Sequence, residues 1–203
     1  MNPSTDFDLK GHCRVICSCV AKRKLWKDTR AVAATEFALI LPVMFLLLIG
    51  MAEVTGAMNQ DRKVARISNA VTDLVAQAET VTEAELLAVM DLGEQVLAPY
   101  PADELEIIIA SVTFNEDGDA EVDWSFDSGS SNPWAEGSEP PITLPDTIVS
   151  PNSSIVVGVT TLNYSPPFAG IFTDYFTRKD ALELSHTYYL RPRLTGTVQC
   201  SNC

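Results

Sequence analysis

The longest apolar stretch of the chain runs from Val32 to Ala52 and holds one charged residue, Glu36. At a rise of about 1.5 Å per residue, a helix of these 21 residues matches the roughly 30 Å of a bilayer core. A spanning segment has to be helical because no water satisfies its backbone groups. A cleaved secretory signal is disfavoured, since its apolar region would be shorter, about 7–15 residues, and would end at an A-x-A-like site. The sequence therefore predicts one transmembrane helix.

Glu36 is the residue of this helix that needs an explanation. A carboxylate near the end of a membrane span costs about 2–3 kcal/mol on insertion scales. Two interpretations follow from the residues alone. Either the acid meets a neutralising partner, or its side chain reaches the cytoplasmic interface.

Charge is spread unevenly along the chain. Residues 1–50 carry seven Lys/Arg and four Asp/Glu, whereas residues 51–203 carry seven and 23. Five of the basic residues directly precede the span: Lys22, Arg23, Lys24, Lys27 and Arg30. The basic flank of a span stays in the cytoplasm, so we expect a single-pass inner-membrane protein with a cytoplasmic N-terminus and a periplasmic C-terminal domain. The acidic outer part argues against nucleic acid as a partner.

Periodicity predicts an α+β fold, in which a long N-terminal helix is followed by a small domain with an antiparallel sheet of about four strands. The helical pattern continues to about Ala78, and Thr82 and Glu85 have the spacing of a capping box that opens a second helix ending before Pro99. Strand patterns follow at residues 105–114, 120–126, 154–164 and 182–190. The expected parts are a cytoplasmic basic leader (1–31), a transmembrane helix (32–58), an amphipathic helical segment (59–98) and a periplasmic sheet domain (99–203).

Two segments between the predicted strands carry large aromatic residues. Residues 128–152 hold five prolines and predict a long surface loop. Its Trp134 is expected to fold back on its own domain. The aromatic cluster between Phe168 and Phe176 is expected to plug the core, because monomers rarely expose so large an apolar patch; a partner-facing patch is the alternative.

Two clusters invite a metal interpretation, and both have the wrong spacing. In the leader the candidate ligands are His12, Cys13, Cys17 and Cys19. Zinc sites usually separate two ligand pairs by a longer loop, so a leader with reduced thiols is the simpler interpretation. In the acid-rich segment 115–119, an EF-hand alignment puts Thr113 and Trp124 at the first and last ligand positions. A hairpin turn is predicted there instead, and no metal or cofactor is expected.

A catalytic set is not expected either. His186 lies on the apolar face of its predicted strand and is interpreted as a hydrogen-bonded core histidine. His12 is predicted on the other side of the membrane, so no Ser/His/Asp or Cys/His set can form on one side. Cys200 and Cys203 form a terminal C-x-x-C, for which a local or intermolecular disulfide is predicted in an oxidising periplasm. A redox-active pair is the remote alternative.

The segment AVAATEFALILP, residues 31–42, follows a short basic leader. It resembles the type IV-like prepilin segment of the Tad (tight adherence) pilus system, in which Gly, four residues and Glu-Phe precede an apolar helix. Together with ISNAVTDLVAQ (67–77), the strands and YYLRPR (188–193), the chain resembles the TadE-like and TadG-like pseudopilins over most of residues 29–193.

This resemblance implies roles for four residues of the segment. A prepilin peptidase would cut between Ala31 and Val32, and the new amine of Val32 would start the mature helix. Glu36, followed by Phe37, would then pair with such an amine on a neighbouring subunit. Ala31 stands where the family has Gly, and TadG-like members stay uncut, so cleavage and retention of the leader both stay open.

The resemblance also implies a function without enzyme activity. The chain is expected to be a minor pseudopilin or a membrane-anchored assembly component of a Tad-type (type IVb-like) pilus involved in adherence. Its implied partners are the bacterial inner membrane, other Tad pilins or pseudopilins, the assembly platform and a prepilin peptidase. The alternative is a single-pass periplasmic sensor or ligand-binding domain outside any filament.

Overall fold

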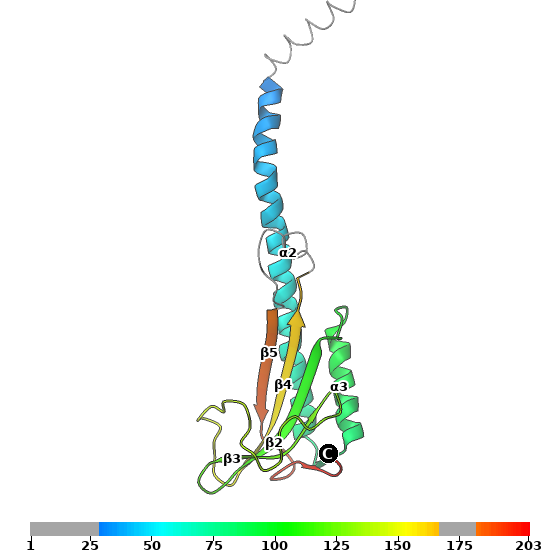
Figure 1. Cartoon of the computed structure of the whole chain (residues 1–203), viewed down its shortest axis with the longest axis vertical. Coiled ribbons are helices and arrows are strands. Elements are labelled where there is room, and N and C mark those ends of the chain that lie inside the picture. The colour runs from blue at the N-terminus through cyan, green and yellow to red at the C-terminus, as the bar shows by residue number, and fades with distance from the viewer. Residues whose placement is uncertain (1–28, 167–181) are drawn as a thin grey trace, which may run out of the picture. The chain divides into compact units, whose positions relative to one another are not determined.

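The structure is a computed structural model that describes residues 29–166 and 182–203 (Figure 1). The predicted leader with its cysteines and the aromatic cluster at 168–176 lie outside the described residues. Contacts divide the chain into two compact units, Met1–Met51 and Ala52–Cys203. The predicted α+β class is confirmed, because a long apolar helix precedes an antiparallel sheet.

The first helix, α2, runs from Thr29 to Ala76 and includes Pro42. The helical pattern predicted it as far as about Ala78. Within the second unit its apolar residues Val64, Ile67 and Val71 are buried. This half of α2 is therefore part of a folded core.

The second helix, α3, runs from Glu83 to Leu97 and has the predicted capping box. The Glu85 carboxylate accepts a hydrogen bond from the Thr82 backbone N–H at 2.9 Å, and the Glu85 N–H donates to the Thr82 hydroxyl at 3.3 Å. At the other end, the Lys63 ammonium of α2 donates to the carbonyls of Val96 and Leu97 at 3.0 and 3.3 Å. Lys63 thus satisfies carbonyls that lack a partner within the helix.

Four strands form the main sheet, as predicted. They are β2 (Leu105–Phe114), β3 (Ala120–Asp127), β4 (Ser154–Tyr164) and β5 (Leu182–Leu190). Their order is β3-β2-β4-β5 with antiparallel neighbours throughout. A two-stranded parallel sheet of β1 (Thr80–Val81) and β6 (Gln199–Cys200) was not predicted, because two residues are too few to show a period.

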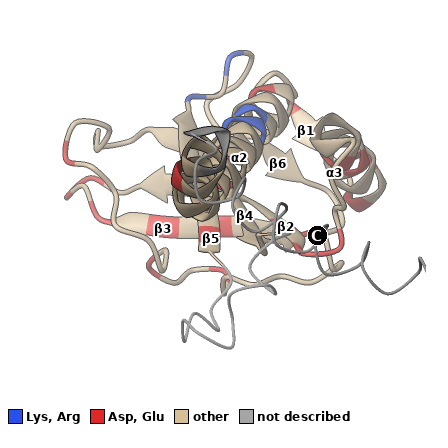
Figure 2. Ribbon diagram, turned by 90° about the horizontal axis from the view of Figure 1, so that it is seen from above, with Lys and Arg blue, Asp and Glu red and all other residues tan. Residues whose placement is uncertain are grey.

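The two faces of the main sheet carry separate apolar cores. Figure 2 shows α2 and α3 on the same side of the sheet, where they bury Ile107 and Ile109 of β2. The opposite face packs against the loop that follows β3, with Trp134 only 6% exposed and part of the cluster around Phe114. The predicted folding back of Trp134 on its own domain is confirmed. The sheet is thus covered by helices on one face and by a long loop on the other.

One helix–sheet contact is closer than side chains normally allow. The Ser68 hydroxyl lies 3.0 Å from the Gly158 carbonyl oxygen, and the Thr72 hydroxyl donates to the Ser68 carbonyl at 2.6 Å. A Cβ on Gly158 would lie 1.9 Å from the Thr72 Oγ1 and 3.1 Å from its Cβ. Because Gly158 has no side chain, α2 rests directly on the backbone of β4.

Candidate functional site

The first candidate site is the apolar part of α2 in the first unit. Its large side chains are exposed, with Phe37, Leu39 and Leu47 at 59%, 78% and 64%. Within residues 29–166 and 182–203, one helix is long and apolar enough to cross a membrane, judged by length and composition. An apolar surface of this extent marks contact with lipid or with another protein. The described part of the chain leaves this segment uncovered.

The four residues singled out by the Glu-Phe motif lie within about two turns of this helix. The peptide bond between Ala31 and Val32 falls near the start of α2, which begins at Thr29. The Thr35 hydroxyl donates to the Val32 carbonyl at 2.8 Å. Phe37 and Val32 are both more than half exposed. The structure thus brings the predicted processing and interaction residues together on one helical segment.

Glu36 lies exposed on this segment. Among the described residues it has no hydrogen-bond or ion-pair partner. A carboxylate on an apolar helix needs a countercharge or an interface. The described part of the chain does not supply this countercharge.

Cys200 and Cys203 lie in the second unit and belong to a different structural feature. They are joined by a disulfide with a Cα–Cα distance of 5.7 Å. The Ser201 N–H donates to the Val81 carbonyl at 3.0 Å, and the Asn202 side-chain oxygen accepts from the Glu83 N–H at 2.9 Å. The C-terminal tail therefore provides an acceptor for the Glu83 N–H in the first turn of α3, where the N–H groups have no acceptor within the helix.

His186 is hydrogen-bonded, as predicted, but it is not a core residue. Its Nε2 lies 2.8 Å from the Asp61 Oδ1, which links β5 to α2. The two side chains are 31% and 44% exposed. Because β5 is at the edge of the sheet, the helix covers its residues only in part. The alternation of the strand predicted which face His186 takes, and it could not predict how far that face is covered.

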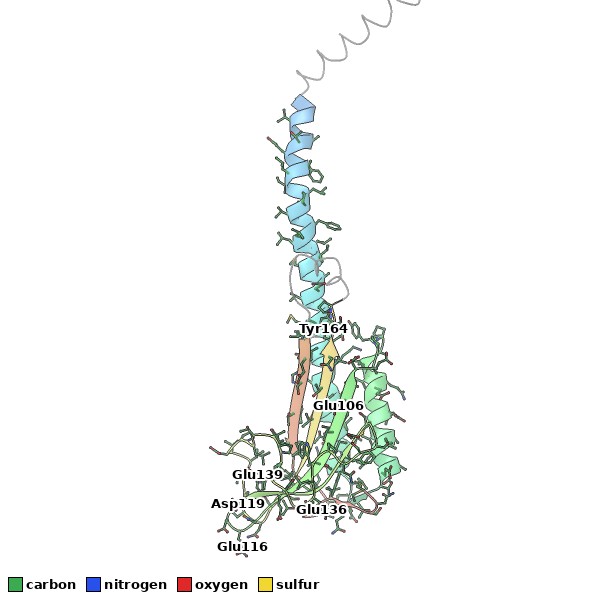
Figure 3. The ribbon with its side chains drawn as sticks, viewed as in Figure 1. Glu106, Glu116, Asp119, Glu136, Glu139 and Tyr164 are labelled. Atoms are coloured by element: carbon green, nitrogen blue, oxygen red, sulfur yellow. A yellow bond between two sulfur atoms is a disulfide. The ribbon has the colours of Figure 1, made fainter. Side chains whose placement is uncertain are left out.

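The acid-rich segment after β2 forms the predicted hairpin turn. The Asn115 side-chain oxygen accepts from the N–H groups of Asp117 and Asp119 at 3.0 and 2.8 Å. Gly118 has a φ of +89°, a conformation that favours glycine. Among the described residues, no three His, Cys, Asp or Glu side chains are grouped so that they could hold a metal ion. The acids Glu116, Asp119, Glu136 and Glu139 gather at the opposite end of the sheet from Tyr164 (Figure 3).

A cavity of about 400 Å³ lies where α2 passes the end of β4, and its lining includes Gln60, Tyr100 and Tyr164. Gly56 also borders it, and a Cβ there would lie 3.2 Å from the Tyr164 hydroxyl. Burial raises the pKa of the Tyr164 hydroxyl, and the nearby Glu53 and Tyr100 raise it further. Gly56 thus brings α2 close to a strand residue of the same chain. No sequence motif marked Tyr164.

The comparison with protein families supports the interpretation of the apolar segment. Residues 31–72 match the model described as TadE-like protein. The match begins at Ala31 and includes Glu36 and Phe37, so the resemblance to the TadE-like family is confirmed over this segment, about a fifth of the chain. The comparisons with curated proteins and with solved structures find no match.

Proposed function

We propose that this chain is a minor pseudopilin or membrane-anchored assembly component of a Tad-type (type IVb-like) pilus, involved in adherence. One observation carries the proposal. The segment that matches the TadE-like model begins with an apolar helix whose side chains the described chain leaves uncovered. A segment of this kind serves both to anchor a protein in lipid and to pack against like helices. The proposal includes no catalytic role.

The proposed topology follows the predicted parts. Residues 1–31 form a cytoplasmic basic leader, residues 32–58 cross the inner membrane, and the following domain lies in the periplasm. Support comes from the flanking charges and from the exposure of Val54 and Met58, at 60% and 52%. In an oxidising periplasm the Cys200–Cys203 disulfide is stable.

In this proposal Glu36 provides the contact between subunits. If a prepilin peptidase cuts between Ala31 and Val32, the amine of Val32 becomes the positive end of the mature helix. Val32 and Glu36 are four residues apart, so a neighbouring pilin shifted by about one helical turn would place its Glu36 beside that amine. Opposite charges in a low dielectric attract strongly. If the leader is retained, no such amine forms and Glu36 has to reach the interface.

The deciding measurement is the intact mass and N-terminal residue of the membrane-extracted protein. Loss of residues 1–31 in cells with the peptidase, and retention in cells without it, would support processing. Glu36→Gln should reduce co-purification of other Tad pilins and surface pili. Glu53→Gln is the matched control, because it removes a carboxylate from the same helix outside the Glu-Phe motif. Unchanged co-purification and piliation with Glu36→Gln would contradict the subunit-contact proposal.

The alternative is a single-pass periplasmic domain that senses or binds a ligand outside any filament. The cavity beside Tyr164 favours it, because a site of about 400 Å³ has the volume of small-molecule pockets, roughly 300–1,000 Å³. Tyr100→Ala and Gln60→Ala open or alter this cavity. Normal piliation in cells lacking the whole protein would favour the alternative over the pilus component.

A further inference from the structure

The positive charges of the domain are few and concentrated. Residues 67–166 contain 18 Asp/Glu and no Lys or Arg. In the described part of the second unit the cations are Arg62, Lys63, Arg66, Arg191 and Arg193. Two of these have partners in the fold: Lys63 binds the carbonyls at the end of α3, and Arg193 pairs with Asp73.

Arg62 and Arg66 differ from these two because both are exposed on α2. Neither makes an ion pair with a described residue. They are four residues apart, so they lie next to each other on one side of the helix. That side is opposite the buried residues Val64 and Ile67. We call Arg62 and Arg66 the basic strip of α2.

The outer side of α3 has the opposite charge. Asp91 and Glu94 are exposed and form no ion pair with a described residue. Ala88, three residues before Asp91, is exposed on the same side. We call Ala88, Asp91 and Glu94 the acidic strip of α3. Figure 2 shows α2, with its Lys and Arg, and α3, with its Asp and Glu, as neighbours in the helical layer on one face of the sheet.

The two strips also lie at the same level along the helices. Gly93 of α3 packs against Ile67 of α2, since a Cβ on Gly93 would lie 2.9 Å from the Ile67 Cγ2. Lys63 reaches the carbonyls of Val96 and Leu97. Arg66 is therefore level with Glu94 in the fold, although their side chains form no ion pair. Two copies placed side by side with parallel α2 helices would bring the basic strip of one level with the acidic strip of the other.

We propose that α2 of one copy docks through its basic strip on the acidic strip of α3 of a second copy. Small residues such as Ala88 let the two helices approach closely, because interhelical distance depends on the side chains at the contact. The remaining acids do not prevent this, since exposed charges farther apart than the Debye length of about 8 Å are screened at physiological salt. Exposed ion pairs contribute little individually, so the contact depends on anchored copies being concentrated in one membrane. In that respect the inference rests on the proposed membrane anchoring.

Cross-linking of the full-length chain in native membranes tests the contact. One tagged copy carries Asn69→Cys, an exposed position one turn from Arg66 and level with Asp91, and a second, differently tagged copy carries Asp91→Cys. A short thiol cross-linker should give a mixed dimer from this pair. The matched control replaces Asp91→Cys by Thr147→Cys, an exposed position in the loop on the other face of the sheet. A mixed-dimer yield no higher than in this control would overturn the proposal.

Charge exchange tests the same contact. With Asn69→Cys and Asp91→Cys as reporters, adding Arg66→Glu to the first copy should lower the mixed-dimer yield about tenfold, because an attractive charge pair becomes repulsive. Adding Glu94→Lys to the second copy should restore it. Equal yields in all three combinations would refute the role of the charges. This assay is done in cells that lack every other Tad component. A negative result therefore does not bear on the Glu36 experiment, and a negative Glu36 result does not bear on this contact.

Discussion

Gly158→Ala should destabilise the domain more than any ordinary glycine-to-alanine change. The new methyl group would lie 1.9 Å from the Thr72 Oγ1 and 3.4 Å from the Ser68 carbonyl oxygen. The Thr72 hydroxyl is held by its hydrogen bond to that carbonyl. Thr72 and Ser68 are completely buried, so neither can turn out of the way. Helix α2 has to move off β4 to make room.

The cost follows from the overlap. Overpacking a core by one methyl group typically costs about 1–3 kcal/mol. Here the overlap is with a β-branched residue of a packed helix, so we expect a loss near the upper limit, about 3 kcal/mol. For a domain of about 150 residues this lowers Tm by roughly 6–12 °C. Such a loss is a large part of the about 5–15 kcal/mol that stabilises a typical domain.

Thermal unfolding of the full-length chain in detergent, followed by the near-UV signal of Trp124 and Trp134, measures this loss. Thr72→Ala removes the oxygen that clashes, and the double variant Gly158→Ala/Thr72→Ala should recover part of the Tm. Recovery is incomplete because the Thr72 Cβ would still lie 3.1 Å from the new methyl group. Gly196→Ala is the matched control, since its Cβ would meet nothing within 4 Å. A Tm within 2 °C of the control, or strictly additive losses in the double variant, would refute the close-packing argument.

Three further predictions concern the ends of α3 and the cavity. Lys63→Met should lower stability by about 1 kcal/mol, because the terminal carbonyls of α3 lose their cation, and the same unfolding assay measures it. Asn202→Ala should cost about 1 kcal/mol, since the Glu83 N–H loses its acceptor; Asn202→Asp should keep the stability, and equal losses for both variants would contradict the capping role. Burial raises the pKa of Tyr164 in the folded state. The protonated hydroxyl therefore stabilises the fold fully at pH values below the unfolded-state pKa of about 10. This stabilisation is lost as the pH rises through the folded-state pKa. Alkaline unfolding should therefore begin at higher pH in Tyr164→Phe, and an identical alkaline midpoint would argue against this.

Much of the fold could be predicted because its elements are long and strongly periodic. The apolar positions of α2 recur every three to four residues, and the strand from Ala120 alternates over its whole length. The capping box at Thr82 was visible because it depends on two residues three apart. Local patterns of this kind are determined by neighbours in sequence.

The features that were missed depend on residues far apart in the chain. Lys63 reaches α3 across more than 30 residues, and Asp61 meets His186 across 125. Gly158 interrupts an apolar strand pattern, and only the approach of α2 explains why it is a glycine. No local pattern contains the position of the second partner, so sequence periodicity could not predict these contacts.

The apolar segment of α2 and the folded domain depend on different side chains. The side chains from Val32 to Met51 contribute little to the core, whereas those from Val64 onward are part of it. Substituting Glu36 should therefore leave domain stability unchanged while it alters association, and substituting Gly158 should do the reverse. If both variants reduced association at unchanged Tm, the division between an interaction segment and a stabilising core would be wrong. One helix thus joins two functions that can be tested by separate variants.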